Sequence, residues 1–385
     1  MRDAPVLAHP SRGAEKNSPA RQARRYAADM KVPLIFACCV VLAGCHKRPA
    51  AETGQSGKDA PATSPTPQRP RVPAMRVPKI EERNAEWYAQ AAAQGDAAAQ
   101  AALGAMYADG TGGVAEDEAK ALEWLRKAAT QGEASAQSRL GAMLAEGKIM
   151  PKDQAEAIAW MEKAAADGNA AAQSRLGVIF AEGAGVPRDA AKAADLIQQA
   201  ATQGNAVAQF NLGVMLATGK GVAKDHAKAV EWYEKSAAQG YAPAEANLGG
   251  MYSEGLGIAK DERKAVGWFQ MAAAQGHAVA QFNLAIRYAG GIGTEKDEAK
   301  AAEWLQKSAF QGYPAAQFNL GVMYANGIGG PKDAVRAWVW YTLAARQNDP
   351  EAAAEKDVLE EAMTAEEKKE AQQVLVELLG KIPGG

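Results

Sequence analysis

The chain has 385 residues, a formal net charge of −2 and three cysteines. Because 43 basic residues balance 45 acidic ones, no overall field favours an anionic surface, and no nucleic-acid partner is predicted. All three cysteines lie within residues 38–45, so the later chain cannot form a disulfide or a thiolate metal site, and no metal or cofactor is predicted.

Residues 30–44 have the pattern of a secretion signal. Lys31 is followed by an apolar run from Val32 to Ala43 that is too short to span a bilayer. The run ends in Leu-Ala-Gly-Cys, which resembles the lipobox of bacterial lipoproteins. The resemblance implies cleavage before Cys45 and a lipid on its thiol. An ordinary signal peptide or a buried apolar segment is the alternative.

Residues 1–29 are polar and show no apolar period, so they fit poorly as part of this signal. They are interpreted as an untranslated or disordered extension with translation starting at Met30, or else as a long charged region of the signal. By resemblance to Gram-negative lipoproteins, His46 after Cys45 favours sorting to the periplasmic face of the outer membrane.

The segment 45–80, which begins with Cys45, is predicted to be a disordered linker. It contains seven prolines among polar and small residues and has no apolar periodicity. Proline fixes φ and removes a backbone donor, so an extended, solvated chain is expected. The lipid on Cys45 would thus tether the later chain to a membrane at some distance.

From residue 81 to residue 350 the sequence repeats itself. Aspartates recur every 36 residues, and a leucine followed by glycine recurs in register with them. The aspartates are Asp117, Asp153, Asp189, Asp225, Asp261, Asp297 and Asp333. This period predicts about seven helix-turn-helix units, stacked as a right-handed all-α solenoid.

Each recurring residue has a structural interpretation, shown here for residues 205–240. Asn205 is predicted to cap a first helix that runs to about Thr218, and Asp225 to cap a second helix that ends at Gly240 in a left-handed conformation. Gly213 lacks a side chain, which would let a neighbouring helix approach closely.

The second helices carry a tryptophan that one helix pair cannot bury alone, so stacked neighbours are expected to cover it. These tryptophans are Trp124, Trp160, Trp232, Trp268 and Trp304, with Trp87 one repeat earlier. With AAQG-type junctions and stretches such as AQFNLGVMYANG, the chain resembles the Sel1-like repeat family, relatives of the tetratricopeptide repeats. Residues 351–385 are predicted to form a terminal capping helix, over about 362–379, and a tail.

The sequence carries no recognisable catalytic motif. No Ser-x-x-Lys or Gly-x-Ser-x-Gly sequence is present, and no histidine pair has metal-ligand spacing. His226 and His277 are interpreted as solvated loop residues, and the Gly-x-Gly pairs as turns between helices. No catalytic residue and no small-molecule substrate are therefore predicted.

The resemblance implies a surface formed by the first helices that binds protein or peptide partners. The candidate binding residues lie just before each repeated leucine: Arg139, Arg175, Phe210, Asn211, Asn247, Phe282, Asn283, Phe318 and Asn319. Asparagines can hydrogen-bond a peptide backbone, whereas the phenylalanines either offer apolar contacts or pack between adjacent units.

Three hypotheses of function follow. The first is a non-enzymatic adaptor that binds a protein or peptide at the bacterial cell envelope. The second is a cell-wall protein with hydrolase activity that interacts with β-lactams or peptidoglycan. The third is a cytoplasmic scaffold, which requires that Cys45 carries no lipid.

Overall fold

A computed structural model describes residues 85–146 and 154–380, and all regular secondary structure within these ranges is helical. The predicted signal peptide, Cys45 and the linker 45–80 lie outside the described residues. The chain forms two compact units, 85–196 and 197–380, called here the N-terminal and C-terminal units. No helix in the described ranges is long and apolar enough to cross a membrane.

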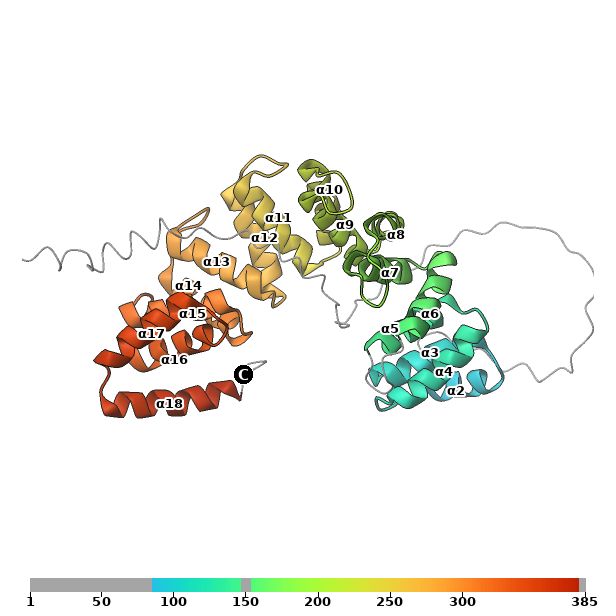
Figure 1. Ribbon diagram of the computed structural model, residues 1–385, viewed down its shortest axis with the longest axis horizontal. Coiled ribbons are helices and arrows are strands. Elements are labelled where there is room, and N and C mark those ends of the chain that lie inside the picture. Colours follow the sequence, from blue (N-terminus) through green and yellow to red (C-terminus); the bar gives the residue numbers. More distant parts are fainter. Residues whose placement is uncertain (1–84, 147–153, 381–385) are drawn as a thin grey trace, which may run out of the picture. The chain divides into compact units, whose positions relative to one another are not determined.

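The N-terminal unit consists of helix pairs joined by short turns (Figure 1). Its helices are α2 (Ala85–Ala93), α3 (Ala97–Asp109), α4 (Glu118–Thr130), α5 (Ala134–Glu146), α6 (Gln154–Ala166) and α7 (Ala170–Glu182). Helix α8 (Ala190–Thr202) contains the boundary between the two units.

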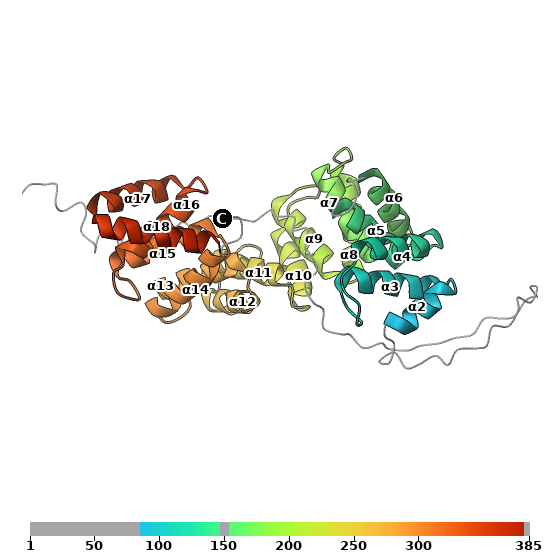
Figure 2. The same ribbon diagram turned by 90° about the horizontal axis from the view of Figure 1, so that it is seen from below.

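The C-terminal unit continues the same alternation and ends in two further helices (Figures 1 and 2). Its helices are α9 (Ala206–Thr218), α10 (His226–Ala237), α11 (Ala242–Glu254), α12 (Glu262–Ala274), α13 (Ala278–Gly290), α14 (Glu298–Phe310), α15 (Pro314–Asn326), α16 (Ala334–Ala345), α17 (Pro350–Ala362) and α18 (Ala365–Leu379). From α9 to α16 each first helix packs against its own second helix, and that helix packs against the next first helix, and α2 to α7 pack in the same order. The predicted stack of helix pairs is therefore confirmed within each unit.

The helix ends of the repeat at 205–240 follow the predicted caps. The side chain of Asn205 accepts a hydrogen bond from the backbone N–H of Ala208 at 2.9 Å, and α9 ends at Thr218. Asp225 accepts from the N–H of Lys228 at 3.0 Å, and this hydrogen bond lowers the pKa of its carboxyl group. Gly240 has the predicted left-handed conformation, with a φ of +75°. The prediction that the helix ends there was wrong, because α10 already ends at Ala237.

The glycine after the repeated leucine permits close packing of the two helices of a pair. A Cβ atom on Gly213 would lie 2.6 Å from the ring of Tyr233, and one on Gly249 would lie 2.7 Å from the ring of Phe269. Gly321 faces Tyr341 in the same way. Tyr233 and Phe269 are among the most completely buried side chains of the described chain. The predicted role of Gly213 is confirmed.

The expectation that stacked neighbours cover the tryptophans was wrong in degree. Trp124, Trp160, Trp232, Trp268 and Trp304 are all half-buried, and the fully buried side chain is the residue that follows each of them. Trp268 and Trp304 do pack against clusters that include the preceding repeat. The helix therefore turns the indole to the rim of the core and the next residue to its centre.

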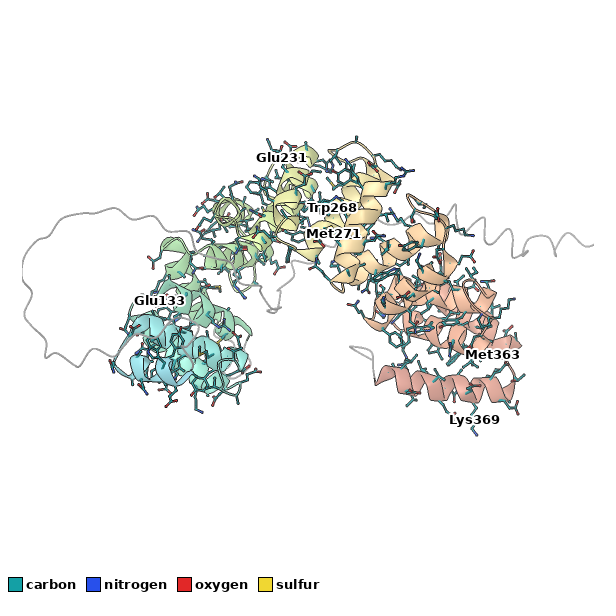
Figure 3. All side chains as sticks on the ribbon, turned by 180° about the vertical axis from the view of Figure 1, so that it is seen from behind. Glu133, Glu231, Trp268, Met271, Met363 and Lys369 are labelled. Atoms are coloured by element: carbon teal, nitrogen blue, oxygen red, sulfur yellow. The ribbon has the colours of Figure 1, made fainter. Side chains whose placement is uncertain are left out.

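A lysine three residues later covers most of these indole rings. The Lys235 amine lies 3.9 Å from the ring centroid of Trp232, and the Lys307 amine lies 4.0 Å from that of Trp304. In α12 the equivalent residue is Met271, which is 49% exposed and lies on the same helix as Trp268 (Figure 3). In these repeats an amphipathic lysine thus covers part of the ring, in addition to the core against which the indole packs.

The C-terminal segment forms two helices rather than one. Helix α18 begins with a capping box in which Thr364 and Glu367 satisfy each other's backbone N–H groups. It packs against α16 and buries Ala371 and Leu375, while its other face is largely polar and exposed. This arrangement matches the capping helix predicted near residues 362–379. Helix α17, which packs against α16, was not distinguished from the sequence.

Candidate interaction surface

The predicted binding residues occupy equivalent positions on successive first helices. Arg139 and Arg175 are the sixth residues of α5 and α7 in the N-terminal unit. In the C-terminal unit the sixth residues of α9, α11, α13 and α15 are Asn211, Asn247, Asn283 and Asn319. These four asparagines, called here the asparagine stripe, repeat every 36 residues on helices that stack in order.

The four asparagines are not equally accessible. Asn211 is only 7% exposed, whereas Asn247, Asn283 and Asn319 are half-buried. The amide of Asn319 donates to the carbonyl of Ala315 on its own helix at 2.6 Å, which leaves its oxygen available. Among the described residues, Asn247 and Asn283 have no hydrogen-bond partner for their side chains. These two can form the largest number of new hydrogen bonds.

Apolar residues accompany the stripe on the same helices. Three residues after each asparagine, at the ninth position, the helices carry Val214, Gly250, Ile286 and Val322. Residues three positions apart are neighbours on a helix surface, so each carboxamide lies beside a small or aliphatic residue. Four residues after Asn283, however, α13 carries the buried Arg287, so this asparagine also has a guanidinium among its neighbours.

Two of the three phenylalanines before the asparagines, Phe210 and Phe282, lie in the core between repeats. Phe210 is 4% exposed, and its ring centroid lies 5.4 Å from that of Tyr241, which precedes α11. Phe282 is 7% exposed and contacts Tyr313 in the same way, at 5.3 Å. Phe318 is half-buried against Tyr341. The packing interpretation thus describes Phe210 and Phe282, and their burial leaves little of either ring for a ligand.

In the N-terminal unit the arginines differ in their partners. Arg139 forms an ion pair with Asp109, the last residue of α3, and both side chains are partly exposed. Such an exposed pair contributes little to stability, about 0–1 kcal/mol. Arg175 is half-buried on α7. The two arginines therefore present positive charge at the positions that asparagine occupies in the C-terminal unit.

A row of buried glutamines, called here the glutamine ladder, connects successive repeats and was not predicted. The amide of Gln281 on α13 donates to the carbonyl of Ala273 at the end of α12, at 3.2 Å. Its oxygen accepts a hydrogen bond from the amide of Gln311, which follows α14, at 2.7 Å. One carboxamide thus connects α12, α13 and the end of α14. The backbone carbonyl of Ala273 can only accept a hydrogen bond, so the nitrogen of the Gln281 carboxamide must face it and the oxygen must face Gln311.

The same amide-to-carbonyl bond recurs throughout the described repeats. The donors are Gln100, Gln137, Gln173, Gln209, Gln281 and Gln317. In the sequence each is the fourth residue of a first helix, 36 or 37 residues from the next such position. This regular spacing, together with the glutamine of the QG junctions, was the available signal.

The interpretation of the two repeat histidines as solvated loop residues was wrong. His277 is half-buried and caps α13, because its Nδ1 accepts a hydrogen bond from the N–H of Ala280 at 3.2 Å. Burial lowers the pKa of His277. His226 begins α10 and is also half-buried. Within the described ranges, no group of three histidine, cysteine, aspartate or glutamate side chains could hold a metal ion.

Two solved structures resemble this chain over most of its length. A protective antigen of uropathogenic Escherichia coli strains, c5321, displays an SLR fold and is 37% identical, with a TM-score of 0.70. The match covers 77% of this chain but only 64% of the antigen, so this chain spans less than two thirds of that protein. A Sel1 repeat protein from Oxalobacter formigenes is 36% identical, with a TM-score of 0.59 and coverage of 71% and 80% respectively.

No curated protein sequence matches the chain significantly. The Sel1 repeat family model matches residues 85–96, 97–133, 134–169, 170–205, 206–241, 242–277, 278–313 and 314–349. Seven of these matches span a whole helix pair and its junction, and the first covers α2 and part of its turn. This chain therefore belongs to the Sel1 repeat family, whose members usually mediate protein-protein interactions and are generally non-catalytic.

Proposed function

We propose that this protein is a non-enzymatic adaptor at the bacterial cell envelope, anchored by a lipid on Cys45, and that its asparagine stripe binds an extended segment of a partner protein. The observation that carries the binding surface is the recurrence of Asn247 and Asn283, with free carboxamides, at one position of stacked helices. A carboxamide both donates and accepts, as recognition of a peptide backbone requires.

The surroundings of the stripe favour a partner segment with uncharged side chains. The residues three positions after the asparagines, Val214, Gly250, Ile286 and Val322, carry no charge. Arg287, four positions after Asn283, is buried and already donates to Ser253, so it is not free to pair with a charged partner residue.

Removing the two accessible carboxamides should weaken binding. We expect the double variant Asn247→Ala and Asn283→Ala to bind a partner captured from envelope extracts about fivefold to a hundredfold more weakly. The reason is that each lost hydrogen bond contributes about 0.5–1.5 kcal/mol. The measurement is the dissociation constant of the purified, identified partner with the full chain and with the variant.

The matched control changes two polar residues away from the stripe. Gln198 and Gln306 are exposed on the second helices α8 and α14, so Gln198→Ala with Gln306→Ala should leave the affinity unchanged. Circular dichroism establishes that both double variants are folded. If the stripe variant binds as tightly as the natural chain, or if the control weakens binding equally, the stripe is not the binding site.

The lipid anchor is tested independently of the stripe. Each buried methylene of an acyl chain contributes about 0.8 kcal/mol to membrane binding, so loss of the lipid should release the protein. We expect Cys45→Ser to abolish incorporation of a labelled fatty acid and to move the protein from the membrane fraction to the soluble fraction. The neighbouring change Cys39→Ser is the control and should leave both unchanged. Retention of the label in Cys45→Ser would exclude this anchor.

A further inference from the structure

One position of the glutamine ladder holds a glutamate. The fourth residue of α11 is Glu245, where six other first helices of the described chain carry glutamine. Glu245 is 1% exposed. The amide of Gln275, in the next junction, donates to its Oε2 at 2.8 Å, as the junction glutamines do to the ladder glutamines of other repeats. Glu245 thus keeps one of the two connections of the ladder.

The second connection requires a hydrogen-bond donor. In the other repeats the glutamine amide donates to the carbonyl of the residue eight positions earlier, near the end of the preceding second helix. The corresponding acceptor for Glu245 is the carbonyl of Ala237, which also accepts from the N–H of Gly240 at 2.8 Å. A carboxylate can only accept hydrogen bonds, so it would place two acceptor oxygens opposite each other with no proton between them. A protonated carboxyl group can donate the hydrogen bond.

The surroundings provide no opposite charge for a carboxylate. Within the described residues Glu245 forms no ion pair, and its hydrogen-bond partner Gln275 is neutral. The charged or titratable side chains on α10 and α12, which pack against α11, are His226, Lys228, Glu231, Tyr233, Glu234, Lys235, Glu262, Arg263 and Lys264. Glu245 lies by the C-terminal ends of these helices, beside Gln275, and the charged side chains in those last turns are Glu234 and Lys235, both exposed. Tyr241 and His277 precede α11 and α13. Burial raises the pKa of Glu245, partly offset by the hydrogen bond from Gln275.

We propose that Glu245 holds a proton in the folded protein and donates it in a hydrogen bond to the carbonyl of Ala237, so that this junction between repeats is sensitive to pH. A carboxyl group with a pKa raised by folding contributes stability at low pH. That contribution is lost as the pH rises through the folded-state pKa. The junction around residues 237–245 therefore tightens on acidification and loosens towards neutral and alkaline pH.

The contribution of His277 to stability changes with pH in the opposite direction, so the test must distinguish it from that of Glu245. Its Nδ1 accepts from Ala280 only when unprotonated, and burial lowers its pKa. Its contribution to stability is present above its ordinary pKa and is lost as the pH falls through the lowered one. Acid thus loosens the start of α13 while it tightens the end of α10, so a local measurement distinguishes the two groups.

Hydrogen exchange of the full chain, followed by mass spectrometry, measures each junction separately. Between about pH 5 and about pH 8, and after correction for intrinsic exchange rates, protection of residues 238–245 should fall on the order of tenfold in the natural chain. In Glu245→Gln this pH dependence should vanish, with high protection at both values. In the matched variant Gln317→Glu, whose junction 310–317 contains no histidine, a similar fall should appear at those residues.

Two results would overturn the proposal. The first is protection of residues 238–245 in the natural chain that does not change with pH. The second is an unchanged pH dependence in Glu245→Gln, since the glutamine keeps both ladder bonds and cannot titrate. If Gln317→Glu fails to fold at neutral pH, its recovery of helical circular dichroism at acid pH gives the same support, and failure at both values counts against the proposal.

Discussion

Gly293→Ala should lower the free energy of unfolding of the C-terminal unit by about 3 kcal/mol or more. Gly293 is the second glycine of the turn between α13 and α14 and has a φ of +69°. A Cβ atom there would lie 2.3 Å from the backbone carbonyl oxygen of Glu262, at the start of α12 in the preceding repeat. Because that oxygen belongs to backbone, it cannot move aside as the end of a flexible side chain can.

The matched control is Gly276→Ala. Gly276 also has a positive φ, +88°, but nothing lies within 4 Å of the position that its Cβ would occupy. The left-handed conformation alone costs an alanine about 1–2 kcal/mol, so this variant should lose about that amount. Urea unfolding and hydrogen exchange over residues 291–297 measure both variants. Equal losses would mean that the close approach at Gly293 does not limit stability.

The Gly293 contact shows what the turn glycines do beyond forming turns. The Gly-x-Gly pairs were interpreted from the sequence as turn geometry, and their positive φ values agree with that. The second glycine also lies against the preceding repeat in three turns: Gly257 at His226, Gly293 at Glu262 and Gly329 at Glu298. A turn signal is local, so it contains no information about which backbone lies on the other side of the glycine.

Periodicity predicted the helices well because the residues that end them act locally. Asn205 and Asp225 cap helices through their own side chains and a backbone N–H three residues away. Such short-range geometry can be derived from residue type and spacing alone. The class of fold follows in turn from the repeated 36-residue spacing of the capping aspartates.

Burial was harder to predict because it depends on the exact angle at which a helix faces its neighbours. The large indole of Trp232 suggested the centre of the core, yet the next residue, Tyr233, is the one that is fully buried. One position on a helix corresponds to about 100° of rotation. Gly213 indicated the true direction, since only a missing side chain leaves room for the ring of Tyr233.

The sequence predicted where the candidate binding residues lie on the helices, but not how accessible they are, and their role in binding stays a prediction. The asparagines do recur at one place on successive first helices, as the repeat register implied. Their exposure differs: Asn211 is mostly buried, whereas Asn247 and Asn283 are accessible in part. The glutamine ladder was missed because a regularly spaced polar residue in a helix can equally well be solvated.

Gly249→Ala should destabilise the C-terminal unit by about 1–3 kcal/mol, although alanine favours a helix by up to about 1 kcal/mol over glycine. The new methyl group would lie 2.7 Å from Cε1 of Phe269, a ring that is fully buried on α12. The ring has no free direction in which to move, because the interior is close-packed. The urea midpoint of the full chain and exchange over α11 and α12 measure this loss.

The next repeat suggests the change that should restore stability. There the residue after the repeated leucine is Ala285, and the residue equivalent to Phe269 is the smaller Leu305. Ala285 and Leu305 lie in one buried cluster. Adding Phe269→Leu to Gly249→Ala should therefore recover at least about 1 kcal/mol relative to the sum of the single changes. Ala285→Gly, which removes a methyl group that fits, should also destabilise the protein. If Gly249→Ala is neutral, or if the two changes are additive, the fit between glycine and ring does not determine how closely the helices of a pair pack.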